Sequence, residues 1–156
     1  MKVHVSGNTF VDQRFFDQYY KPSLNNLLSK GAEIYVGGAN GIDRLTQQYC
    51  LDQSIDPKRV HVYDKGNQDN RLSSEFIHVN EFKTYSDRDE ALTNITDQDL
   101  CFVHQYGGGG SGTFTNVIRR QFGSEIAKSI QKLFRKHSSE YGNLHDLQLI
   151  ILEIDK

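Results

Sequence analysis

The chain has 156 residues, of which 37% are hydrophobic and 24% are charged, and its formal net charge is −2 at pH 7. This length and balance predict one globular domain over residues 1–156 and exclude a disordered chain. The near-neutral charge, with no basic stretch, argues against a protein that tracks a nucleic-acid backbone, so nucleic acid is not an expected partner.

No apolar run approaches the roughly 18 residues needed to span a membrane, and residues 1–7 lack the pattern of a signal peptide. We therefore expect a cytoplasmic protein without a membrane partner, which folds alone or as a small homo-oligomer. Cys50 and Cys101 fall in a predicted helix and a predicted strand, without metal-ligand spacing, and are predicted to be core residues. The sequence predicts no metal site and no cofactor.

The first part of the chain alternates short β-branched runs with helically spaced apolar residues. Pro22 marks a break within the first helical stretch. The predicted elements are a strand at 3–5, a helix from 15 to 28, a strand at 33–36, a helix at 42–51 and a strand at 59–63. Residues 64–84 are polar and irregular, and the length of this segment favours a functional loop, such as a lid, or else a mobile segment.

The second part continues the same alternation. The predicted elements are a helix beginning near Ser86, a strand at 99–104, helices at 113–122 and 125–134, and a strand at 147–152. Strands that alternate with helices pair in parallel and carry helices on both faces of the sheet. The sequence therefore predicts an α/β fold, a Rossmann-like three-layer sandwich with a mostly parallel sheet of five strands or slightly more.

Three loops leave the carboxyl ends of predicted strands, which is the edge where ligands bind in such sheets. They begin at Ser6, at Gly37 and at Gly107. Glycine allows a close backbone approach to a phosphate, and a following helix offers unpaired N–H groups and a partial positive charge. Neither of the two longer loops is a Walker A motif or a dinucleotide fingerprint. The alternative for each loop is a simple turn or a lid.

A nucleotide-like small molecule is the predicted partner. The residues predicted to bind it or its phosphate are Ser6, Gly7, Asn8, Gly37, Gly38, Ala39, Asn40, Gly41, Asp43, Arg44, Arg88, Gly108, Gly109, Gly110, Ser111, Gly112 and Thr113. Arg44 follows a glycine turn in a helix amino terminus, where a cation suits a bound anion better than it suits the helix dipole. The alternative for Asp43 and Arg44 is a capping aspartate and a surface arginine.

Other polar residues near these loops carry weaker predictions. Arg88 is the expected anion ligand within a charged cluster, which could also be a solvated helix face. His104 and Tyr106 close a predicted strand beside the glycine run, which would place an imidazole or a stacking ring near a base. The alternative is that His104 packs, as strand-end histidines more often do. Arg119 and Arg120 lie about two helical turns beyond the glycine run and are expected to face solvent.

Four segments together resemble the SLOG superfamily, the Rossmann-like group that includes the Smf and LOG proteins, and in particular its small stand-alone bacterial and phage members. The segments are residues 3–8, residues 37–45 with Gly-Gly-Ala-Asn-Gly-Ile-Asp-Arg-Leu, the surroundings of Arg88, and residues 108–113. The resemblance implies a fold that binds nucleotides and senses or processes nucleotide-derived signals. In its LONELY GUY branch, which hydrolyses nucleoside monophosphates, a glutamate stands where this chain has Asn116. An amide cannot take a proton as a carboxylate does.

Two functions remain open at this stage. The first is a nucleotide-binding sensor or sequestering module. The alternative is an N-glycosidase, phosphoribohydrolase or ribosyl transferase, with Asp43, Asp87 and Asp89 as candidate catalytic residues. The single-stranded DNA binding of the Smf branch is disfavoured by the near-neutral charge.

Overall fold

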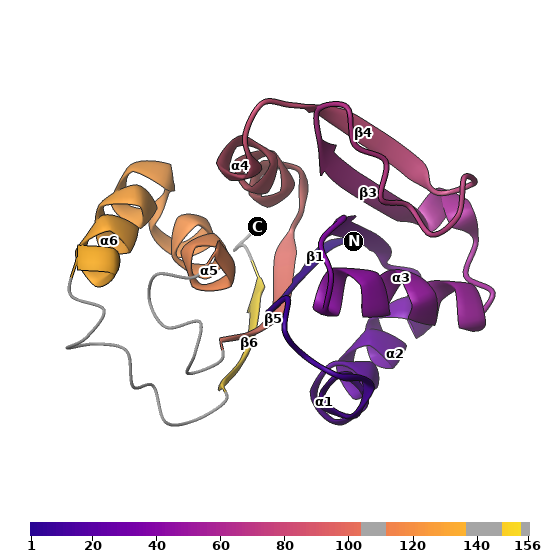
Figure 1. Ribbon diagram of the computed structural model, residues 1–156. Coiled ribbons are helices and arrows are strands. Elements are labelled where there is room, and N and C mark those ends of the chain that lie inside the picture. The colour runs from indigo at the N-terminus through magenta and orange to yellow at the C-terminus, as the bar shows by residue number, and fades with distance from the viewer. Residues whose placement is uncertain (104–111, 137–147, 154–156) are drawn as a thin grey trace.

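The computed structural model describes residues 1–103, 112–136 and 148–153, and their helices and strands follow one another in α/β order (Figure 1). The elements are β1 Lys2–Ser6, α1 Gln13–Tyr19, α2 Lys21–Ser29, β2 Glu33–Gly37, α3 Ile42–Asp52, a 3-10 turn Pro57–Arg59, β3 Val60–Lys65, β4 Ile77–Phe82, α4 Tyr85–Ile95, β5 Gln98–Val103, α5 Gly112–Phe122, α6 Ser124–Lys136 and β6 Gln148–Glu153. Within the described residues, no helix combines the length and the apolar character needed to cross a membrane.

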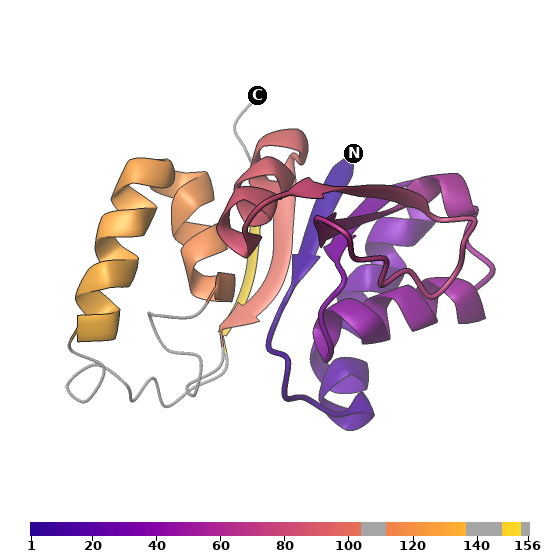
Figure 2. The same ribbon diagram turned by 45° about the horizontal axis from the view of Figure 1, so that its top comes forward.

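The described strands form one six-stranded sheet in the order β4-β3-β2-β1-β5-β6. The strands from β4 to β5 pair in parallel, and β6 pairs with β5 in the antiparallel direction. Helices α1 to α3 lie on one side of the sheet and α4 to α6 on the other (Figures 1 and 2). The predicted three-layer α/β sandwich is confirmed, with one strand more than the five that were counted from the sequence.

The extra strand is β4, and it lies inside the segment that was predicted to be irregular. That prediction is wrong for residues 77–82. β4 is an edge strand that pairs only with β3, and Ile77 is 38% exposed. An edge strand of this kind lacks the continuous apolar run by which buried parallel strands are recognised.

The sheet face toward α1, α2 and α3 carries the apolar core. Alternation along each strand directs the following residues to this face: Val3, Val5, Ile34, Val36, Val60, Val62, Leu100 and Phe102. Phe16, Tyr20 and Leu24 cover them from the first two helices. α1 ends at Tyr19 and α2 begins at Lys21, so the predicted break before Pro22 is confirmed. Cys50 and Cys101 are buried, as predicted.

The opposite sheet face is polar along its central strands. His4 lies beside Asp99 in the register of β1 and β5, and both are buried. Arg120 on α5 binds Asp99 through Nε–Oδ2 at 2.7 Å and Nη2–Oδ1 at 3.0 Å. Arg119 is 5% exposed and donates to Asn116 Oδ1 at 2.7 Å. The expectation that these two arginines face solvent is therefore wrong. Arg120 points toward the sheet, and Arg119 contacts a residue of its own helix.

Candidate functional site

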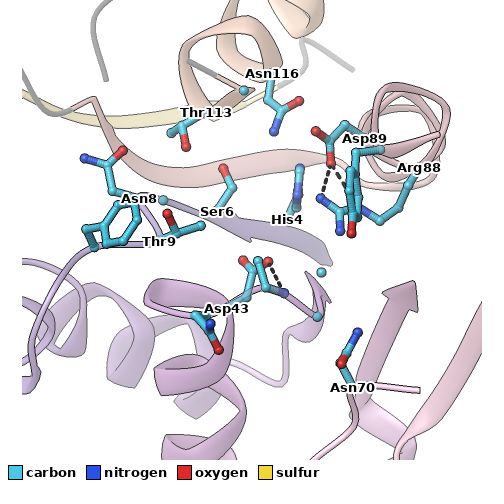
Figure 3. Close-up of a pocket in the computed structure, with 18 of the residues that line it drawn as sticks. His4, Ser6, Asn8, Thr9, Asp43, Asn70, Arg88, Asp89, Thr113 and Asn116 are labelled. Atoms are coloured by element: carbon cyan, nitrogen blue, oxygen red, sulfur yellow. Dashed lines mark hydrogen bonds and ion pairs between the residues drawn. The ribbon is translucent and has the colours of Figure 1, made fainter. Parts of the chain in front are cut away.

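A cavity of about 990 Å³ opens at the carboxyl ends of the central strands, between the loops and helices of both layers. Its walls come from the β1–α1 loop, the β2–α3 loop, the segment between β3 and β4, α4 and the start of α5 (Figure 3). After β1 the chain adds β2, β3 and β4 on one side and then crosses to place β5 on the other. The cavity therefore lies at the topological switch point of the sheet, the position where open α/β sheets bind ligands.

Tyr20 bridges β1 and β5 from behind the cavity wall. Its hydroxyl donates to the Ser6 carbonyl at 2.8 Å and accepts from Phe102 N–H at 2.9 Å, so it bridges the two strands where they separate. Burial raises the pKa of Tyr20 well above its ordinary value, which keeps the hydroxyl protonated. A Cβ at Gly7 would collide with this hydroxyl and with Ile42. Glycine is required there because the chain passes next to the Tyr20 hydroxyl where it leaves β1.

Gly37 and Gly38 make room for side chains of the protein itself. A Cβ at Gly37 would lie 2.7 Å from Asp43 Oδ2 and 3.1 Å from the Arg88 guanidinium carbon, and one at Gly38 would collide with Asp64 Oδ1. Internal packing thus accounts for both glycines, which is the simple-turn alternative for this loop. The same packing brings Asp43 and Arg88 together over the end of β2.

Gly41 locks the two loops on the Asp43 side of the cavity together. Its φ is +76°, and a Cβ there would collide with the Asn8 carbonyl and with Thr9. Ile42 N–H donates to the same Asn8 carbonyl at 3.2 Å. The β1–α1 loop is therefore fixed against the amino terminus of α3.

Asp43 is a buried carboxyl group in the cavity wall. Its Oδ2 accepts from Ala39 N–H at 3.2 Å, and its side chain turns into the cavity from the first turn of α3 (Figure 3). Burial raises the pKa of Asp43 to about 6, although the charge of Arg88 and the hydrogen bond from Ala39 act in the opposite direction. His4 also lowers this pKa, and Asp89 raises it. Asp43 therefore exchanges its proton close to neutral pH.

α4 supplies a cation that is already held by its neighbours. Arg88 donates through Nε and Nη2 to Asp89 Oδ1 at 3.1 Å and 3.0 Å, and its guanidinium carbon lies 4.9 Å from the centre of the Tyr85 ring. When ionised, Asp43 and Asp89 carry two negative charges against the single positive charge of Arg88. The described charged side chains alone would therefore not attract a phosphate.

The amino terminus of α5 brings several hydrogen-bond donors to the cavity wall. Gly112 and Thr113 lie in its first turn, where backbone N–H groups have no partner within the helix. Asn116 is 3% exposed, and because its Oδ1 accepts from Arg119, its Nδ2 is left to donate into the cavity (Figure 3). Asn116 is thus a donor oriented by a buried arginine.

The cavity brings together most of the predicted site residues that the structure describes. These are Ser6, Gly7, Asn8, Gly37, Gly38, Ala39, Asn40, Asp43, Arg88, Asp89, Gly112 and Thr113. Gly41, Arg44 and Asp87 do not line the cavity, and Arg44 and Asp87 are exposed. His104, Tyr106, Gly108, Gly109, Gly110 and Ser111 lie outside the described residues.

Several lining residues were missed by the sequence reasoning. They are His4, Thr9, Phe10, Gln68, Asn70 and Tyr85, and Asn116 had been considered only as a lost glutamate. His4 could have been found, because it shares with Ser6 the strand face that ends at the first loop. Gln68 and Asn70 belong to the segment between β3 and β4, whose predicted functional role fits their position.

A group of three side chains behind Asn70 has a spacing that could hold a metal ion. One ligand atom each from Asp64, Asp69 and His78 lies within 4.8 Å of the others. Asp64 already accepts from Asn70 N–H at 2.9 Å, from Asn70 Nδ2 at 2.8 Å and from His78 Nε2 at 2.8 Å. Arg71 binds Asp69 and lowers its pKa. These contacts hold Asn70 in the cavity wall without any ion.

Comparisons of the chain with protein-family models, with curated proteins and with solved structures find no match. The resemblance to the SLOG superfamily accordingly stays a prediction from the motifs, and the function is argued below from the cavity.

Proposed function

We propose that this chain binds a nucleotide or a nucleotide-derived phosphate ligand in the cavity and acts as a sensor or sequestering module. The observation that carries the proposal is the separation of two polar regions within one cavity at the switch point. Donors gather at the start of α5, and a buried carboxyl group lies across from them at the start of α3.

The phosphate fits the α5 region. Its first-turn N–H groups, the Thr113 hydroxyl and Asn116 Nδ2 are all able to donate, and the helix dipole favours an anion at this end. Asp43 would repel a phosphate placed beside it, whereas the charge of Asp89, whose Oδ2 lies 3.8 Å from the Cβ position of Gly112, is offset by Arg88. The anionic end of the ligand therefore belongs at Gly112 and Thr113.

The sugar fits the α3 region. The carboxyl oxygens of Asp43 can accept hydrogen bonds from the adjacent hydroxyl groups of a ribose. Asn8 and Asn40 line the same part of the wall and carry both donors and acceptors. A ribose with its 5′-phosphate would thus span from Asp43 to the start of α5.

Calorimetric titration with AMP, GMP, CMP, UMP, NAD and ADP-ribose tests the proposal. At least one is expected to bind, and Gly112→Val is expected to abolish that binding because the new side chain covers the α5 N–H groups. Among the described residues a Cβ at Gly112 has only Asp89 Oδ2 near it, at 3.8 Å, so we expect the helix start to accommodate the change. Gly66→Val, which lies outside the cavity, is the control, and circular dichroism checks folding. Absence of binding by the whole panel contradicts the proposal.

A second candidate function is cleavage or transfer at the N-glycosidic bond. It is favoured by Asp43, because a pKa of about 6 suits proton transfer near neutral pH. Asp89, held by Arg88, would supply a second carboxylate, whereas Asp87 is exposed outside the cavity. Incubation with the same nucleotides and chromatography for released base tests this function. Release that disappears in Asp43→Asn would replace the binding-only proposal.

A further inference from the structure

Phe10 is an apolar ring at the cavity that the described residues leave almost fully exposed. It lines the cavity and is 98% exposed, more than any other large hydrophobic side chain among the described residues. Leaving a phenylalanine in water forgoes about 1.5–3 kcal/mol of burial energy. Nothing in the packing of the described residues uses this ring.

The backbone on both sides of Phe10 is nevertheless fixed. Asn8 is held by Ile42 N–H and by the close approach of Gly41, and Asp12 caps α1 by accepting from Phe15 N–H at 2.9 Å. Val11, next to Phe10, packs against the apolar core. Phe10 is therefore presented outward from a short span with both ends anchored.

Tyr85, the other exposed ring of the wall, is in a different situation. It is 50% exposed, but Arg88 lies 4.9 Å and Lys65 Nζ 5.2 Å from its ring centre, and its hydroxyl accepts from Gln68 Nε2 at 3.3 Å. Tyr85 is engaged in holding the arginine. Of the two rings, Phe10 is the one with a face available to a ligand.

We propose that Phe10 is the stacking platform for the planar base of the ligand, so that the cavity takes nucleotides rather than sugar phosphates. The inference rests on the proposed function. With phosphate at α5 and sugar at Asp43, the base is directed toward the cavity mouth, and the Phe10 loop adjoins Asp43 through Gly41. Aromatic stacking accepts any base, because every base has a π face.

The sequence contains no tryptophan, which allows a direct test. Phe10→Trp introduces a single tryptophan at the proposed platform, which can be excited selectively over the tyrosines, and its emission is expected to be quenched by the nucleotide of the panel that binds. Ribose 5-phosphate, which has no base, is expected to leave the emission unchanged. Phe122→Trp is the matched control, since Phe122 is 56% exposed on α5 and lies outside the cavity.

Affinity measurements complete the test. Phe10→Ala is expected to weaken nucleotide binding by roughly 5- to 150-fold, and Phe10→Tyr to preserve it. Equal affinity of Phe10→Ala and the unaltered chain would overturn the stacking role and leave the proposed function intact. Failure of every nucleotide to bind the unaltered chain would overturn both.

Discussion

The two faces of the sheet are built from different kinds of side chain, although they share the same strands. Toward α1, α2 and α3, Val3 and Val5 enter an apolar core, whereas toward α5, Asp99 lies beside His4 and binds Arg120. The apolar face gains stability from burial alone. The polar face needs specific partners, and its strand ends open into the cavity.

The same contrast appears between two buried carboxyl groups. Asp99 is bound by Arg120, and its pKa is lowered by His4 and Arg120 in spite of its burial. Asp43 has no ion-pair partner within 4.0 Å among the described residues, and burial raises its pKa to about 6. One carboxyl group therefore stabilises the folded chain in its charged form, and the other is held in the cavity at an energetic cost. Two substitutions test this contrast, and a third tests a further buried carboxyl group, Asp64.

The largest effect is expected from Asp99→Ala, which leaves Arg120 buried without its carboxylate. Breaking one partner of a buried ion pair costs about 3–5 kcal/mol. Urea denaturation should show this loss in the free energy of unfolding. Asp87→Ala, which removes an exposed carboxylate, should change it by no more than about 0.5 kcal/mol. A loss below about 1 kcal/mol for Asp99→Ala would mean that the pair does not fasten α5 to the sheet.

The second effect depends on pH and has the opposite sign. Because the pKa of Asp43 is higher in the folded than in the unfolded chain, its contribution to stability is full below about pH 4 and is lost as the pH rises through about 6. Asp43→Asn should therefore stabilise the chain at pH 8 by on the order of 2–3 kcal/mol. The gain should vanish near pH 4. Denaturation at the two pH values measures it, and equal effects at both would contradict the raised pKa.

The smallest effect is expected from Gly38→Ala, in the wall of the cavity. Gly38→Ala places a Cβ against Asp64 Oδ1 and should destabilise the chain by about 1–3 kcal/mol, because Asp64 is locked by Asn70 and His78. In Gly66→Ala the nearest atom, the Phe82 carbonyl oxygen, is at 3.5 Å, so little change is expected. Thermal melts compare the two. Equal melting temperatures would show that Asp64 moves aside without cost.

Much of the fold could be predicted because buried parallel strands followed by glycine loops leave a strong local pattern. Strands 3–5 and 33–36 and the helix at 42–51 agree with β1, β2 and α3. The grouping of their loops followed from topology alone, since parallel strands present their carboxyl ends at one edge. That is why twelve predicted residues line a single cavity.

The remainder depends on contacts between residues distant in sequence. β4 has one pairing partner and an exposed side, so its pattern is weak. Arg44 and Arg88 were both plausible anion ligands, and only the packing of α4 against the end of β2 places Arg88 in the wall and leaves Arg44 outside. Arg120 has a partner on another element, and its burial could not be inferred from helix position alone.

The Tyr20 bridge makes the cavity depend on the layer behind the sheet. The Tyr20 hydroxyl joins Ser6 and Phe102, and Tyr20 lies between α1 and α2. Both helices pack against the apolar core. A state in which α1 detaches would lose the Tyr20 bridge between β1 and β5 beside the cavity. If a ligand binds as proposed, its binding and the docking of α1 are therefore thermodynamically linked. Occupancy of the cavity should slow amide hydrogen exchange in α1, on the far side of the sheet from α5.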